Sequence, residues 1–155
     1  MSDLWAQERA DRLSQASPLA DRMRPTELDE VIGQEPVLGE DTLLRRLIVS
    51  DRMGSILLWG PPGTGKTTIA SLIARQTGRR FISANAAMIG VRDIREAIDS
   101  SRRHIEAGDK ATILFLDEIH RFSRSQQDVL LGDVERGIIT LIGATTENPW
   151  YAVNA

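Results

Sequence analysis

The sequence contains no cysteine, which excludes a disulfide framework, a thiolate metal site and a cysteine nucleophile. It also lacks any apolar run long enough to cross a membrane. The first residues, MSDLWAQERADRL, include acidic side chains and no apolar core, so they are not a secretory signal. We therefore expect a cytoplasmic protein that does not engage a membrane.

Lysine is scarce, because only Lys66 and Lys110 occur and every other basic side chain is an arginine. The net charge is −3 and the sequence pI about 5.4. A free-standing nucleic-acid-binding domain usually has a basic excess or stripe, and this chain has neither. Any contact with DNA should therefore be local or shared with other parts of an assembly. The length of 155 residues fits one domain.

Alternating short apolar runs and helical periodicities predict an α/β fold with a parallel sheet, of the P-loop NTPase three-layer type. Strands are expected over residues 55–59, 81–84, 112–117 and 138–144, and helices over 3–14, 42–52, 66–77, 91–108 and 123–135. Asp41 and Ser125 are the expected caps of the second and last of these helices. The segment 14–36 contains three prolines and Gly33, and is expected to be an extended or turn-rich strap over the domain.

The segment GPPGTGKT, residues 60–67, matches the P-loop pattern G-x-x-x-x-G-K-[ST] between an expected strand and an expected helix. Glycines let such a loop turn its N–H groups inward, and the helix start adds its positive dipole end. Lys66 should neutralise the β and γ phosphates of ATP, and the Thr67 hydroxyl should ligate Mg²⁺. A Gly/Pro turn that binds nothing is the disfavoured alternative. The expected nucleotide-binding residues are Gly60, Pro61, Pro62, Gly63, Thr64, Gly65, Lys66, Thr67 and Thr68.

Asp117 and Glu118 end the apolar run ILFLDE, at the edge of an open α/β sheet where ligands bind. Asp117 should hold Mg²⁺, directly or through water, and Glu118 should orient and polarise the attacking water. Without the P-loop upstream, such a pair would be read as a solvated strand end. GATTEN, residues 143–148, ends the next strand, and its hydroxyls are expected to face the γ-phosphate. His120 is equally compatible with simple packing, so no role is assigned to it.

Together these features resemble the AAA+ ATPases, in which a strap with the pattern RPxxLDxxxGQ precedes GPPGTGKT; here it reads RPTELDEVIGQ, residues 24–34. Within that class, PLADRMRPTELDEVIGQ, GVRDIREAI, LFLDEIHRFSRSQQD and GIITLIGATTENP resemble the replication-associated recombination protein A (RarA/MgsA) family over residues 18–154. That family is related to clamp-loader subunits and to the Holliday-junction motor RuvB.

The resemblance implies a role for each matching position. Lys66 and Thr67 match the Walker A pair, Asp117 and Glu118 the Walker B pair, and Thr146 the catalytic sensor 1 residue. The strap residues at 31 and 32, valine and isoleucine, match positions that line the adenine pocket. Members of the family hydrolyse ATP, form homo-oligomers and act with DNA in replication, recombination and repair at stalled forks.

The chain departs from the family pattern after AVNA, where the family continues into an arginine finger, a closing strand, a helical lid and an oligomerisation domain. We therefore expect an extension over 1–17 and a truncated AAA+ core over 18–155, with slow unaided hydrolysis. In the AAA+ strand order 5-1-4-3-2, the strand at 55–59 would then be an exposed edge. A catalytically incompetent nucleotide-binding fragment is the alternative, and a P-loop metabolic kinase is a weaker third.

Overall fold

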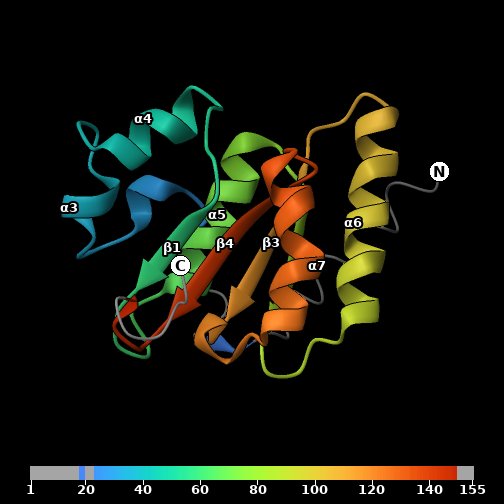
Figure 1. The fold of residues 1–155 in the computed structure, drawn as a ribbon. Helices are drawn as coiled ribbons and strands as arrows, with labels where there is room; N and C mark the ends of the chain where they lie inside the picture. The colour runs from blue at the N-terminus through green and yellow to red at the C-terminus, as the bar shows by residue number, and fades with distance from the viewer. Residues whose placement is uncertain (1–17, 20–22, 150–155) are drawn as a thin grey trace.

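The computed structural model describes residues 18–19 and 23–149. Its centre is a parallel sheet in the order β1-β4-β3-β2 (Figure 1). The strands are β1 (Ile56–Trp59), β2 (Phe81–Asn85), β3 (Thr112–Asp117) and β4 (Ile139–Thr145). The predicted α/β fold with a parallel sheet is confirmed, and each strand begins within one residue of its predicted start.

Helices cover both faces of the sheet. One face carries α5 (Lys66–Thr77). The short helices α3 (Glu35–Leu38) and α4 (Leu43–Val49) contribute to the core cluster on the same face. The other face carries α6 (Val91–Glu106) and α7 (Arg124–Glu135), which lie side by side (Figure 1). Two short 3₁₀ helices, η1 (Leu28–Glu30) and η2 (Ile119–Arg121), lie in the strap and directly after β3. The fold is therefore a three-layer α/β/α arrangement.

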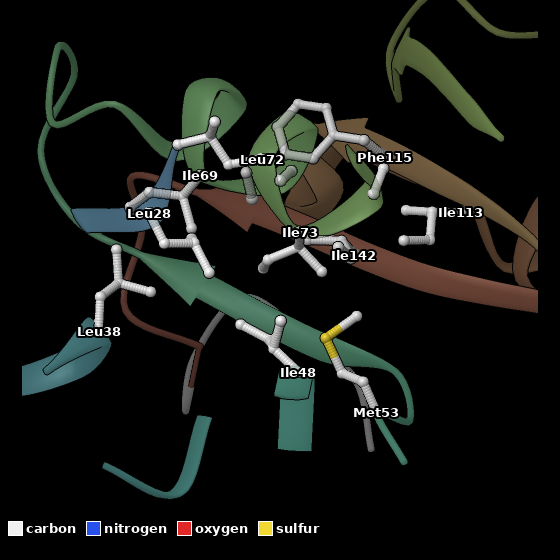
Figure 2. Packing of buried hydrophobic residues seen from close by; sticks show 13 residues of the cluster. Leu28, Leu38, Ile48, Met53, Ile69, Leu72, Ile73, Ile113, Phe115 and Ile142 are labelled. Atoms are coloured by element: carbon white, nitrogen blue, oxygen red, sulfur yellow. The ribbon is translucent and has the colours of Figure 1, made fainter. Parts of the chain in front are cut away.

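Strand β3 divides the core in two because its successive side chains point to opposite faces. Ile113 and Phe115 pack into the cluster beneath α5, whereas Leu114 and Leu116 pack beneath α6 and α7. All four are at most 1% exposed, which explains why this strand appears in the sequence as a continuous apolar run. Figure 2 shows the first cluster, where side chains from η1, α3, α4 and α5 meet those of β3 and β4.

The helix boundaries correct two expectations about caps. Helix α4 is capped by Thr42, whose side chain accepts a hydrogen bond from the Arg45 backbone N–H, rather than by Asp41. Helix α7 is capped by Ser123, rather than Ser125. Ser123 has extended backbone angles and forms a reciprocal capping box with Gln126, so the helix cap lies two residues earlier than expected.

The strap is more regular than predicted, because η1 and α3 both form within it. Strand β1 lies at one edge of the sheet and pairs only with β4 in the described part of the chain, which agrees with the predicted exposed edge. No helix among the described residues is long and apolar enough to span a bilayer. The helix predicted over 3–14 and the extension over 1–17 lie outside the described residues.

Candidate functional site

The P-loop segment connects the carboxyl end of β1 to the start of α5. Gly63 and Gly65 have φ angles of 76° and 82°, in the left-handed region that favours glycine. Gly65 is also the residue from which α5 begins, so the helix N-terminus faces the loop. The Thr64 hydroxyl donates to the Pro61 carbonyl oxygen at 2.9 Å and fixes the turn. The loop therefore has the backbone shape that a phosphate-binding turn requires.

The Lys66 side chain folds into this loop. Its Nζ donates to the carbonyl oxygens of Gly60 and Pro61, both at 2.8 Å, and lies 3.3 Å from the Thr64 Oγ1. Three oxygen atoms thus surround the ammonium group, as phosphate oxygens would. The chemistry of this donor set, together with the helix start, fits a polyphosphate ligand.

Asp117 ends β3 and holds the start of the following turn. Its Oδ1 accepts a hydrogen bond from the Glu118 backbone N–H at 2.9 Å, and its carbonyl oxygen accepts one from Ala86 N–H at 2.8 Å. The first bond orients the carboxylate, and the second holds the Asp117 backbone at the edge of the sheet. Glu118 then adopts φ 53° and ψ 45°, a left-handed conformation that is rare for a residue other than glycine.

The Glu118 carboxylate is 41% exposed and has two neighbours. Asn85 Nδ2 donates to its Oε2 at 3.3 Å, and Arg121 Nε lies 3.8 Å from the same atom. Asn85 was not singled out from the sequence. It is the last residue of β2 and is in register with Asp117, so the signal that identifies it is strand pairing rather than local pattern.

Thr145 connects the strand end that precedes Thr146 to the P-loop. The Thr145 carbonyl oxygen accepts a hydrogen bond from Gly60 N–H at 3.2 Å, and its side chain is buried. Thr146, the residue predicted from the sequence, follows one position after β4 and is exposed. His120 Nδ1 lies 2.9 Å from the Thr145 Oγ1, a contact that the sequence did not reveal.

The residues expected to hold Mg²⁺ are also placed at this edge of the sheet. Thr67 is exposed in the first turn of α5, and Asp117 is partly exposed at the end of β3. No group of three or more His, Cys, Asp or Glu side chains in the described ranges could hold a metal by itself. One carboxylate and one hydroxyl fit Mg²⁺, which keeps several waters and is usually shared with substrate phosphates.

The strap reaches the P-loop through one residue. Gln34 Nε2 donates to the Thr64 carbonyl oxygen at 3.5 Å, a long hydrogen bond. Val31 packs against the first core cluster, whereas Ile32 is 92% exposed. Their role at an adenine pocket stays a prediction.

Comparison with known families gives a match to the ATPase family associated with various cellular activities (AAA) over residues 56–151. The replication-associated recombination protein A of Coxiella burnetii is 52% identical over 137 residues, which are 88% of this chain and 30% of that protein. The protein of the same name from Escherichia coli is 50% identical over 138 residues, 89% of this chain and 31% of the relative. The chain thus spans about a third of the length of these relatives.

Among solved structures, the Holliday junction branch migration motor RuvB of Thermotoga maritima is similar, with a TM-score of 0.66 and 32% identity. The alignment covers 81% of this chain and 42% of that one. This likeness supports the α/β fold of the chain.

Proposed function

The chain belongs to the AAA family of ATPases, and from this premise we propose that it binds ATP with Mg²⁺ at residues 60–68 and supplies the hydrolytic residues Asp117, Glu118 and Thr146. The reaction is ATP plus water to ADP plus phosphate. The proposal concerns the site within this chain, and each residue's role is part of it.

One observation carries the proposal: the three motifs meet at one edge of the sheet. The register pairs Trp59 with Thr145 and Leu116 with Gly143. All the strands are parallel, so the segments that follow β1, β3 and β4 emerge on the same side. This is the edge at which open α/β sheets bind ligands. The hydrogen bond from Gly60 N–H to the Thr145 carbonyl oxygen joins two of these segments directly.

Each side chain has a chemical task that its position allows. Lys66, at the start of α5, holds the β and γ phosphates. Asp117 and Thr67 would hold Mg²⁺, which offsets the charge that develops on the phosphate oxygens. Glu118 accepts a hydrogen bond from the attacking water and orients it, while Asn85 fixes the carboxylate. Thr146 donates to the γ-phosphate from beyond the end of β4.

We propose further that the protein to which this chain corresponds acts with DNA in replication, recombination and repair at stalled forks, in the cytoplasm and as a homo-oligomer. The names of the two RarA relatives and the likeness to RuvB, a branch migration motor, support the part of this proposal that concerns DNA replication and recombination. The net charge of −3 gives no basic excess, so DNA contact is expected from the assembly rather than from this segment alone.

Thermal unfolding with and without Mg²⁺–ATP tests the binding step. A ligand that binds only the folded state at 100 times its Kd stabilises it by about 2.7 kcal/mol, so the midpoint should rise by several degrees. Lys66→Ala should abolish this rise. Lys110→Ala is the matched control, because Lys110 is the other lysine and is paired with Asp51; the rise should persist.

Hydrolysis is tested separately with Glu118→Gln, which keeps the size of the side chain and removes its charge. This variant should bind Mg²⁺–ATP as the parent chain does and lose phosphate release. Equal turnover in the variant and the parent would refute the role of Glu118. The absence of any ATP-dependent rise in midpoint for the parent chain would refute the binding site itself.

A further inference from the structure

His120 lies in η2, two residues after Glu118, and its side chain is only 11% exposed. Its Nδ1 is 2.9 Å from the Thr145 Oγ1, and its Nε2 is 3.6 Å from the Glu147 Oε1. Both nitrogens therefore face the end of β4 and the turn after it. The contact with Thr145 is made in either ring tautomer, because Nδ1 donates in one and accepts in the other, and a hydroxyl can do both.

A glycine in β4 explains how η2 comes so close. A Cβ at Gly143 would lie 2.6 Å from Ile119 Cδ1 and 3.0 Å from Leu57 Cδ1, so the ends of these two side chains would have to shift to admit it. The missing side chain lets Ile119 pack directly onto β4. His120, the next residue, is thereby brought to Thr145, although the two are separated by 25 positions in the chain.

Thr145 is also hydrogen-bonded to the first residue of the P-loop. Its carbonyl oxygen accepts from Gly60 N–H at 3.2 Å, and its Oγ1 accepts from Glu147 N–H at 3.0 Å. The second bond closes the turn that contains Thr146. His120, by bonding the same Oγ1, fixes the rotamer that this turn requires. The connection therefore runs from the segment after Glu118, through Thr145, to the turn at Thr146 and to the start of the P-loop.

His120 lies between the Thr145 hydroxyl and the Glu147 carboxylate, as the base of a catalytic triad lies between its nucleophile and its orienting carboxylate. Thr145 is only 1% exposed, so a substrate cannot reach its hydroxyl. A metal site is equally excluded among the described residues, because no cluster of three ligating side chains occurs there. The arrangement is suited to holding a backbone turn rather than to chemistry of its own.

We propose that His120 is a positioning residue that holds the Thr145–Glu147 turn so that Thr146 faces the γ-phosphate. This rests on the proposed ATP site. If His120 positions this turn, misplacing the turn should weaken the affinity for a ligand that has a γ-phosphate. The affinity for a ligand without a γ-phosphate should stay unchanged. A histidine that only packed the core would change both affinities together, or neither.

The experiment measures the affinity of the chain for Mg²⁺ with the β,γ-imido analogue of ATP, and for Mg²⁺ with ADP, by calorimetric titration. In His120→Ala the analogue should bind about three- to tenfold more weakly, the effect of one hydrogen bond, while ADP binding stays within about twofold. Thr145→Val should give the same split. Thr145→Val removes the contact with His120 and also the hydrogen bond from Glu147 N–H, so the double variant should lose no more than Thr145→Val alone.

Conservative and matched variants separate positioning from folding. His120→Asn places an amide near the position of Nδ1, and Thr145→Ser keeps the hydroxyl, so both should recover most of the analogue affinity. His104→Ala is the control, because this second histidine of the chain bonds the Ser100 carbonyl oxygen on α6 instead. It should leave the ratio of the two affinities unchanged.

The outcomes distinguish the two proposals. If the parent chain binds neither nucleotide, the proposed ATP site is wrong and this inference falls with it. If the parent chain binds both, and His120→Ala weakens them equally or not at all, the ATP site stands and the positioning role is refuted. An additive double variant would also refute it, because His120 and Thr145 would then act through separate contacts.

Discussion

Glu118 occupies a backbone conformation that favours glycine, and its substitution should therefore reveal stored strain. Its φ and ψ of 53° and 45° lie in the left-handed region, where Cβ approaches the following carbonyl oxygen. Glu118→Ala and Glu118→Gly both remove the carboxylate and the hydrogen bond from Asn85. The two variants differ only in Cβ, so comparing them isolates the backbone contribution.

The magnitude follows from two opposing effects. The left-handed conformation costs a residue with a Cβ about 1–2 kcal/mol. Glycine loses about 0.5–1 kcal/mol more chain entropy on folding than alanine does. We therefore expect Glu118→Gly to be more stable than Glu118→Ala by about 0.5–1 kcal/mol, or about 2–3 °C in Tm for a chain of this size.

Urea unfolding of both variants measures this difference as a change in midpoint at constant m-value. Glu96, exposed in the middle of α6, is the control position. There the order should reverse, with the glycine variant about 1 kcal/mol less stable than the alanine variant, because the backbone is an unstrained helix. A glycine variant at 118 that is no more stable than its alanine counterpart would refute the argument.

Three further predictions concern residues that support the fold around the site or lie at the edge of the sheet. The Lys110 ammonium holds the pKa of Asp51 below its ordinary 3.8; Asp51→Asn should therefore cost about 0.5–1 kcal/mol at pH 7, a difference that closes as the pH falls below about 4 in urea titrations. Gly143→Ala should cost about 1–3 kcal/mol by overpacking, and Ile119→Val, which removes the nearest atom, should restore part of it; additive losses would contradict this. Leu57→Lys should reduce concentration-dependent association through the edge of β1, measured by light scattering; unchanged association would rule that edge out.

Local patterns identified the parts of the site whose residues are neighbours in the chain. The P-loop follows an apolar strand and begins a helix, so each of its residues could be placed from the sequence, and α5 spans Lys66–Thr77 as predicted. The pair Asp117 and Glu118 was found for the same reason. The helix expected over 42–52 ends early, at Val49, because Asp51 adopts a left-handed φ of 52° that no sequence rule indicated.

The contacts that the sequence did not reveal join residues far apart in the chain. Asn85 reaches Glu118 because two strands pair in register, and strand register is not written in either strand alone. His120 reaches Thr145 because Gly143 has no side chain. Each of these residue types is common in sequences, so the contact between His120 and Thr145 could be found only from the packing of η2 on β4.

The hydrogen bonds of Lys66 have a consequence for the affinity of the loop. Its Nζ already has three oxygen neighbours, supplied by Gly60, Pro61 and Thr64. These oxygens act as a tethered competitive inhibitor, because a phosphate must displace them to reach the ammonium group. Since each such bond is worth about 1 kcal/mol, every bond that the phosphate displaces should weaken nucleotide affinity about fivefold relative to a lysine held clear of the loop. We therefore expect the loop to bind free phosphate weakly and to favour ligands that make enough further contacts to displace these three oxygens.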